Sequence, residues 1–436
     1  MRLTAFGIAC AALIAAAAPA RADDPEDFSF HGQTTFVDQY HPRFHADYTG
    51  PNSLNPGNRG DETFDATLFL GLKLWQGGAV YADPEIDQGF GLSGTLGVAG
   101  FPSGEAYKVG ADDPYFRLQR LFVRQSVDLG GETQTIAPDA NQLGGAKTAD
   151  NLIVTIGKFA VTDVFDTNAY AHDPRGDFLN WALIDAGAFD YAADAWGYSA
   201  GAAVEWTQDW WTLRGGLFDL STIPNSKTLD SRFSQFEMVG EFEARQTWFG
   251  GDGKIKLLGF LNRGRMGSYD AALRLAQATG NPPDTALVRR YNSKAGASLN
   301  IEQPLGGNWG AFARASLNDG SQEAFEFTEI NRSLSAGVSL KGADWDRAKD
   351  TLGAAFVVNG LSRDARDYFA AGGLGLLIGD GRLPNAGSED ILEAYYSAEL
   401  RDGIAASADY QFIANPAYNR DRGPVSVLGL RLHGEF

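Results

Sequence analysis

The sequence predicts an all-β protein, namely a transmembrane antiparallel β-barrel of 16 strands with one long loop folded inward as a constriction loop. Three observations predict it. Apolar and polar residues alternate at period two in many segments. The links between those segments are alternately short and long, and most tryptophans lie beside the short links. The composition agrees, because 53 glycines, 28 phenylalanines and 15 tyrosines favour strands joined by turns.

Residues 1–22 have the features of a secretory signal peptide. Arg2 precedes an apolar run from Ala5 to Ala18, and small residues flank Arg21, so cleavage is expected before Asp23. A membrane anchor would need about 20 apolar residues followed by basic ones, whereas acidic residues follow here. We therefore expect a signal peptide at 1–22 and one barrel domain at 23–436.

Export would leave a chain without cysteine and with a larger negative charge. Cys10, the one cysteine, lies in the signal, which excludes disulfide and thiolate chemistry. Loss of Arg2 and Arg21 lowers the net charge from −19 to −21, which argues against a nucleic-acid partner. After residue 22 no stretch of 18 apolar residues remains, so helical membrane spans are excluded as well.

Strands are predicted wherever apolar and polar side chains alternate. Between 64 and 75 the even positions are apolar and the odd ones mostly polar, and the same contrast recurs from 334 and from 392. In the last strand, which ends in Phe436, Leu428 and Leu430 alternate with Arg431. A soluble β-sandwich has the same alternation, so this pattern alone does not separate the two classes. Trp75 falls on the polar face, and its register is left open.

The lengths of the links favour the membrane barrel. Short links are expected near 76–78, 207–209, 250–253, 303–307, 342–349 and 401–403. Longer links are expected at 40–61, 88–114, 162–194, 220–232, 263–290, 318–326, 361–388 and 415–423. Short and long alternate except at 130–150, a long link on the short side. Tight periplasmic turns opposite long outer loops are typical of transmembrane barrels, and the count gives 16 strands with both termini inside.

The tryptophans give an independent indication, because a membrane barrel needs amphipathic rings at the lipid–water interface and a sandwich does not. Seven of the nine lie in or beside short links: Trp75, Trp206, Trp210, Trp211, Trp248, Trp309 and Trp345. This distribution predicts an aromatic girdle at one rim.

A barrel of 16 strands leaves an aqueous lumen unless something fills it. Strand parity assigns many charged residues to the inward face, where water solvates them; a basic residue facing lipid at mid-bilayer would cost roughly 2 to 4 kcal/mol. The set is Arg120, Arg124, Arg214, Glu237, Glu241, Glu243, Arg245, Arg314, Glu393, Glu399, Asp409, Arg431 and His433. In the simpler interpretation, these charged residues are only solvated by the water of the lumen. In the more specific interpretation, the arginines form a row along the channel, where they exchange hydrogen bonds with polar solutes.

The third long link, 162–194, mixes acidic, basic, amide and aromatic groups. Phe165, Phe178, Leu179 and Trp181 need apolar surroundings, and folding inward against the wall would bury them while leaving the polar groups to face the channel. Such a loop would narrow the pore and would supply the polar and aromatic contacts that a sugar needs. The alternative is an external cap over the barrel mouth.

Several blocks of sequence together carry a family resemblance. They are GKFAVTD at 157–163, DPR at 173–175, NWA at 180–182, ADAWGY at 193–198, RLFVRQ at 120–125, GGLG at 372–375, IGDG at 378–381 and NPAYNRDRGP at 415–424. In these blocks the chain resembles the carbohydrate-selective porins of the OprB type. The resemblance implies a 16-stranded outer-membrane barrel that passes monosaccharides such as glucose by facilitated diffusion, through a charged constriction that contains arginine.

Matching the blocks residue by residue implies a set of constriction residues, to which inward parity adds Arg214 and Arg314. The set from the resemblance is Arg120, Arg124, Lys158, Asp163, Asp166, Asp173, Arg175, Asp177, Asn180 and Trp181. No catalytic residue, metal or cofactor is expected. The expected surroundings are those of a Gram-negative outer membrane: membrane lipid and lipopolysaccharide, small sugars, and the barrel-insertion machinery, which would recognise the last strand ending in Phe436. A homo-oligomer is left open.

Three enzyme-like motifs lack the context that they need. The glycine pattern at 89–94 is not followed by an amphipathic helix, GYSAG at 197–201 lies inside a predicted strand, and Pro42 argues against a helical metal site at His41 and His45. An enzyme is therefore not expected. Two alternatives to a sugar channel remain: a general or ion-selective porin, and a barrel enzyme or adhesin that acts through its outer loops.

Overall fold

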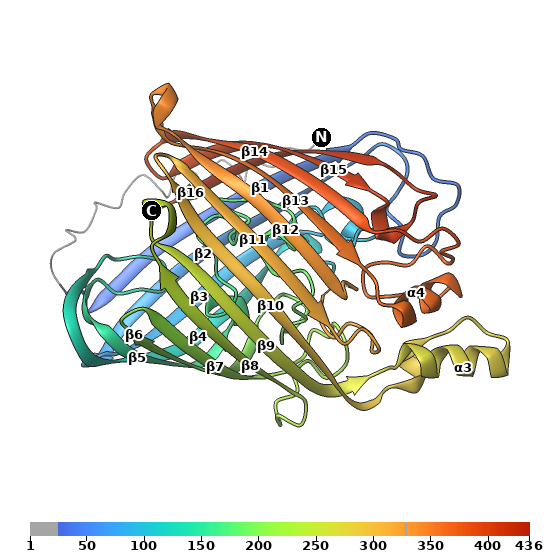
Figure 1. The fold of residues 1–436 in the computed structure, drawn as a ribbon, viewed down its shortest axis with the longest axis horizontal. Helices are drawn as coiled ribbons and strands as arrows, with labels where there is room; N and C mark the ends of the chain where they lie inside the picture. The colour runs from blue at the N-terminus through green and yellow to red at the C-terminus, as the bar shows by residue number, and fades with distance from the viewer. Residues whose placement is uncertain (1–24, 328) are drawn as a thin grey trace.

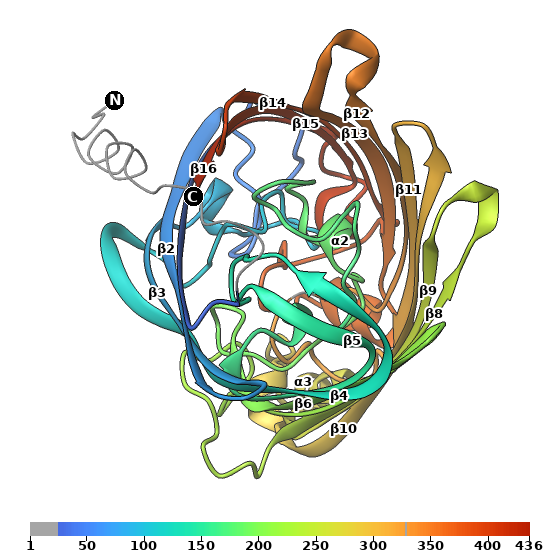
Figure 2. The same ribbon diagram turned by 90° about the vertical axis from the view of Figure 1, so that its left-hand side faces the viewer.

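The computed structural model describes residues 25–327 and 329–436. The signal peptide expected at 1–22 lies outside the described residues. In this part of the chain 16 antiparallel strands close into one barrel, each next to its neighbour in sequence, with β1 pairing β16 (Figures 1 and 2). The predicted fold class and strand number are thus confirmed.

The strands have the following bounds: β1 Phe28–His41, β2 Arg59–Trp75, β3 Gly78–Gly89, β4 Ala111–Ile136, β5 Gly145–Phe159, β6 Ser199–Gln208, β7 Trp211–Asp219, β8 Phe236–Gln246, β9 Gly253–Met266, β10 Arg290–Gly306, β11 Trp309–Asn318, β12 Arg332–Gly342, β13 Arg347–Gly360, β14 Glu389–Arg401, β15 Ile404–Ala414 and β16 Val425–Glu435. The links between them alternate between short and long. We call the two rims of the barrel the short-turn end and the long-loop end.

Strand parity predicts the two faces of the wall correctly. Leu68, Leu392 and Leu430 are exposed on the outside, where they contribute to the apolar belt that lipid contacts. Asp65 and Glu393, from the opposite parity, are buried inside. A shift in the β2–β3 register between Lys73 and Trp75 turns Trp75 outward, which resolves its irregular parity. The exposed tryptophans lie at the short-turn end, as the girdle predicts.

The prediction of a long link at 130–150 is wrong. β4 and β5 continue to pair beyond Gly130, from Thr133 opposite Thr148 to Ile136 opposite Gly145, so that residues 137–144 alone form the link. Register shifts on both sides of Gly130 break the alternation there, which hides the strands in the sequence. This hairpin lies across the barrel opening at the short-turn end (Figure 2).

The tip of this hairpin contacts the inside of the wall. The Asn141 amide donates to Asp83 Oδ2 at 2.8 Å, and the Leu143 backbone N–H donates to the buried Tyr81 hydroxyl at 3.3 Å. We call residues 137–144 the inturned tip. It narrows the lumen at the short-turn end.

Three helices lie in the long links: α2 Trp181–Ile184, α3 Tyr269–Thr279 and α4 Arg363–Ala370. Asn180, Ser268 and Ser362 cap their N-termini with side-chain oxygens. Short 3-10 turns are η2 Leu92–Gly94, η3 Val161–Asp163, η4 Trp248–Gly250, η5 Thr285–Val288, η6 Ala343–Trp345 and η7 Pro416–Tyr418. Figure 1 shows α3 and α4 side by side beyond the long-loop end. Among the helices of residues 25–327 and 329–436, none has the length and hydropathy of a membrane span.

The third long link folds into the barrel, as the sequence predicts, rather than capping it from outside. α2, which belongs to it, lies within the ring of strands (Figure 2) and is buried throughout. Phe165 packs edge-on against Phe218 of β7, and Phe178 packs against Phe312 of β11 and Tyr395 of β14. The apolar residues of the link therefore find their surroundings on the wall itself.

A candidate constriction inside the barrel

Carboxylates of the barrel wall hold the inward loops by their backbones. Glu393 of β14 accepts hydrogen bonds from the backbone N–H groups of Leu179 at 2.5 Å and Asn180 at 3.0 Å. Glu389, on the same strand, accepts from Ala99 and Gly100, at 2.9 and 2.7 Å. A buried carboxylate is costly unless donors surround it, and these N–H groups supply the donors. The wall thereby fixes both the 90–110 and the 160–198 links.

A second set of anchors surrounds Asp166, which is fully buried. Arg314 of β11 lies 3.3 Å from the Asp166 carboxylate and also donates to the Asp166 carbonyl at 3.0 Å. Asn300 donates to Asp166 Oδ1 at 2.8 Å, and Ala186 N–H donates to Oδ2 at 2.6 Å. These polar groups find their hydrogen-bond partners among one another. Their role is therefore to hold the 160–198 link against the wall.

Where these loops meet, they enclose a cavity of about 230 Å³. Of the residues predicted from the sequence, Arg120, Asp163, Asp173, Arg175 and Trp181 line it. The link at 90–110 also contributes to its lining, with Phe101, Glu105, Tyr107 and Lys108 among others. Nothing in the sequence indicated an inward position for that link. The cavity is therefore formed by more than one loop, and Asn225, Phe327 and Leu377 of three further links also line it.

Arg120 and Asp163 form a closed pair on the edge of the cavity. Arg120 Nε and Nη2 donate to the two carboxylate oxygens of Asp163 at 2.7 and 2.6 Å, and Nη1 is 3.5 Å from Asp83. Burial would raise the pKa of Asp163, but the charge and hydrogen bonds of Arg120 outweigh it and hold the pKa below its usual value. Both partners stay ionised and bound to each other.

Arg175 differs, because carboxylates surround its guanidinium without binding it closely. Glu105, Asp65, Asp173 and Glu85 lie 3.4, 3.5, 3.9 and 4.0 Å away. Its Nε is buried and donates no hydrogen bond within the described residues, and Asp65 Oδ1 likewise accepts none. A guanidinium carries five N–H donors, so Arg175 has donors left for a solute.

An aromatic wall lies across the same cavity. Trp181 stacks on Phe101 with ring centroids 5.1 Å apart at an angle of 14°, and it contacts Phe327 at 4.9 Å and Tyr191 at 5.7 Å. Phe101, Trp181, Tyr191 and Phe327 all line the cavity. The cavity thus combines donors and acceptors with aromatic side chains, and a ring of hydroxyl and C–H groups requires both.

His172 and Asp185 also line the cavity and were missed by the sequence analysis. His172 Nδ1 lies 3.7 Å from Asp185 Oδ1. Burial lowers the pKa of His172, but Asp185 outweighs burial and raises it above its usual 6.5. Both residues belong to the link that the sequence singled out, yet nothing in their spacing indicates that they meet.

Other predicted residues hold the loop instead of lining the cavity. Asn180 caps α2 and donates to Gly100 O and Gln411 Oε1, at 2.8 and 3.0 Å. The Asp177 carboxylate accepts from the His172 N–H at 3.2 Å and closes a turn within the link. With Asp166 and Arg314 they form the support of the constriction.

The remaining predicted residues lie elsewhere on the wall. Arg124 donates to Asn141 O at 2.8 Å in the inturned tip. Lys158 lies opposite the outward-facing Leu121 and pairs with Asp194 at 3.3 Å. Arg214 is bound between Glu205, Glu241 and Glu243 at 2.8 to 3.0 Å. Within residues 25–327 and 329–436 no group of three or more His, Cys, Asp or Glu side chains could hold a metal ion.

Comparisons with known proteins bear on the family and the fold. The family described as "Carbohydrate-selective porin, OprB family" matches residues 51–436. The high-pH structure of Pseudomonas putida OprB superposes with a TM-score of 0.71 at 15% identity over 94% of both chains, which is a likeness of fold. Its low-pH structure gives 0.47 at 12% over 94% and 93%, and a mutant of Rh. blastica porin gives 0.45 at 10% over 94% and 100%. No curated protein matches the sequence.

Proposed function

The chain belongs to the OprB family of carbohydrate-selective porins, and we propose that the cavity around Arg175 is the constriction at which it selects its sugar. As a member of this family it is a carbohydrate-selective porin of the Gram-negative outer membrane, a channel and not an enzyme. Its outer face contacts membrane lipid. Outer-membrane barrels have short periplasmic turns and long external loops, which assigns the short-turn end to the periplasm.

The observation that carries the proposal is the unused hydrogen-bonding capacity of Arg175. Its guanidinium lies among four carboxylates at 3.4 to 4.0 Å, so donors and acceptors face the same small space. A sugar hydroxyl both donates and accepts, and could bind Arg175 and Asp65 together. Trp181 and the aromatic rings packed around it supply apolar surface to the same cavity, for the C–H groups of the sugar. Arg175 is thereby proposed as the residue that recognises the sugar, and Arg120 and Arg314 as residues that hold the loop in place.

Planar-bilayer recording tests the channel and its selectivity. The purified protein is expected to conduct ions, and glucose or a related sugar is expected to reduce the current in a saturable way, because bound sugar occupies the constriction. A conducting protein that no sugar blocks would contradict the sugar site and indicate a general or ion-selective porin. A protein without conductance would contradict the channel itself, and would leave action through the outer loops as the alternative.

We also propose the steps that bring the protein to its membrane. Residues 1–22 act as the signal peptide, and 23–436 form the exported barrel. The insertion machinery recognises β16 and the terminal Phe436, whose N–H donates to Gly32 O at 3.0 Å at the seam where β16 meets β1. Lipopolysaccharide surrounds the external half of the barrel. Cleavage is checked by the N-terminal sequence of the mature protein, which should begin at Asp23.

A further inference from the structure

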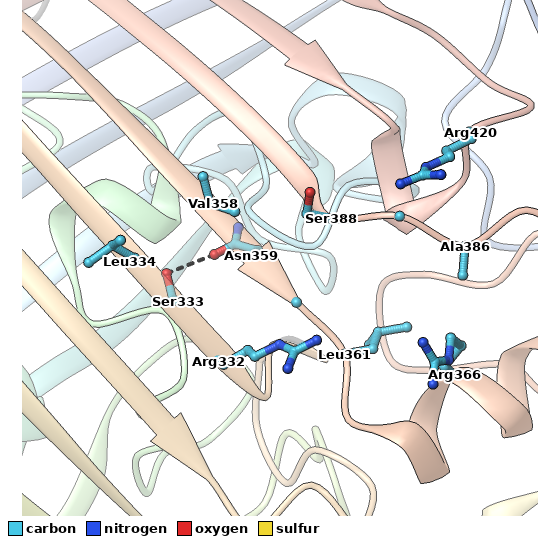
Figure 3. A pocket seen from close by; sticks show the side chains of 12 residues that line it. Arg332, Ser333, Leu334, Val358, Asn359, Leu361, Arg366, Ala386, Ser388 and Arg420 are labelled. Atoms are coloured by element: carbon cyan, nitrogen blue, oxygen red, sulfur yellow. Dashed lines mark hydrogen bonds between the residues drawn. The ribbon is translucent and has the colours of Figure 1, made fainter.

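A second pocket, of about 500 Å³, opens on the outer face of the barrel at the long-loop end (Figure 3). It lies where β12 begins and β13 ends, next to residues 386–388 before β14. Leu334 and Val358 line one margin and are 54% and 40% exposed on the lipid-facing side of the wall. The pocket therefore adjoins the apolar belt at its external edge.

Three arginines line this pocket: Arg332 at the start of β12, Arg366 on α4, and Arg420 in the link after β15 (Figure 3). None of them has a carboxylate within 4.0 Å in the described ranges, 25–327 and 329–436. The cavity arginines Arg120 and Arg175 both have such partners. Three guanidinium groups that share one pocket repel each other, so a bound anion would be stabilising.

Two glycines allow these arginines to lie close to the backbone. A Cβ at Gly360 would be 2.6 Å from Arg332 Nε, and a Cβ at Gly387 would be 2.8 Å from Arg420 Nε. Both glycines line the pocket. Without side chains there, the guanidinium groups rest over the strand ends, beside the apolar margin.

One carboxylate lies on the same outward row of the wall. Asp390 of β14 pairs in register with Val358 of β13, and it is not among the residues that line the pocket. Asp364 and Asp367 on α4 and Asp421 after Arg420 are near in sequence, but no carboxylate lies within 4.0 Å of the three guanidinium groups in the described ranges.

We propose that the pocket binds a phosphate group on the headgroup of lipopolysaccharide in the outer leaflet. Guanidinium groups bind phosphate in a two-point, planar geometry, and a cluster from three elements can surround it. The apolar margin at Leu334 and Val358 can contact the acyl chains of a lipid, whereas a free anion would make no favourable contact with it. The proposal rests on the external assignment of the long-loop end, and it shares no residue with the sugar constriction.

Binding of bisphosphorylated lipid A to the purified full-length protein in detergent tests this site. The triple variant Arg332→Gln, Arg366→Gln, Arg420→Gln is expected to bind at least about tenfold more weakly, since each lost contact to a charged group is worth about 1.5 kcal/mol or more. Dephosphorylated lipid A should bind both proteins equally weakly. Arg363→Gln is the matched control, because Arg363 lies on the same helix, pairs with Asp367 and does not line the pocket.

A second variant keeps all three charges. Gly360→Ala should displace Arg332 and weaken lipid A binding without changing the charge of the surface. Equal affinity of the wild type and the triple variant for lipid A would overturn the proposal. So would displacement of lipid A by inorganic phosphate at equal concentration, which would indicate a free-phosphate site. Sugar block, recorded on the same variants, should be unchanged, so that failure of the lipid site and failure of the sugar site are distinguished.

Discussion

Arg120 holds Asp163 through two hydrogen bonds of 2.7 and 2.6 Å, which join the fourth strand of the wall to the loop inside it. This relationship gives Arg120 a structural part in the constriction as well as a place on its lining. Its two donors toward Asp163 are in use, whereas those of Arg175 are not. Substitution of each residue separates these two roles.

Arg120→Ala should loosen the constriction loop and cost about 2 kcal/mol of stability, because it leaves a partly buried carboxylate without its donors. Urea unfolding in detergent measures the loss, and sugar block should weaken along with it. The double variant Arg120→Ala, Asp163→Ala should lose less than the sum of the two single changes. Strictly additive losses would contradict the pairing.

Arg175→Gln should weaken sugar block about tenfold, since a hydrogen bond to a charged group contributes about 1.5 kcal/mol or more. It should also lower stability, because the buried carboxylates of Asp65, Glu85 and Glu105 lose the cation that lies among them. The block constant for glucose in planar bilayers is the measurement. Arg263→Gln, an exposed arginine of β9 that does not line the cavity, is the control and should behave as wild type. Sugar block that is unchanged in Arg175→Gln would remove this residue from the site.

Replacing the inturned tip, residues 137–144, by a two-residue Asn-Gly turn should raise the single-channel conductance, because the tip lies across the periplasmic opening. Arg124→Ala should change conductance in the same direction and by less, since it removes one hydrogen bond to Asn141, worth about 1 kcal/mol. Sugar block should stay the same in both. The sequence suggested a sugar contact for Arg124, and a weakened block in Arg124→Ala would restore that interpretation.

His172 should make the constriction more stable at low pH. Its pKa is raised in the folded protein, so the stabilisation by Asp185 is complete below the unfolded value of about 6.5 and is lost as the pH rises through the higher folded value. The melting temperature in detergent is expected to fall as the pH rises above about 6.5. His172→Gln should flatten this part of the profile; a wild-type profile that rises with pH would show the opposite sign.

Much of the wall could be predicted from the sequence because each side chain of a strand points either to the lipid or to the lumen. Leu430 and Arg431 differ in face by parity alone, and lipid on one side and water on the other fix which is which. Parity does not predict the face of a residue where the pairing of two strands shifts in register, as at Trp75 and beyond Gly130. Nothing local in the sequence marks those shifts.

The site could be predicted only as a neighbourhood. The buried Phe165 and Phe178 indicated correctly that the third loop folds inward. Arg175 and Arg314, by contrast, look alike in the sequence. They differ because Arg314 donates to Asp166 across 148 positions of the chain, whereas the buried Nε of Arg175 lies among carboxylates and donates no hydrogen bond within the described residues. Such pairings depend on the closed barrel and have no trace in spacing or composition.

The wall carboxylates bind the loops through backbone N–H groups. The position of the loops is therefore independent of the loop side chains that determine which solute binds. Every amino acid except proline offers that N–H, so the anchors at Ala99, Ala169 and Leu179 do not depend on which side chain the loop carries. Side chains toward the cavity are thereby free to diverge while the scaffold is retained. A lineage, or an engineer, can change the solute that passes by exchanging loop residues and leaving all 16 strands as they are.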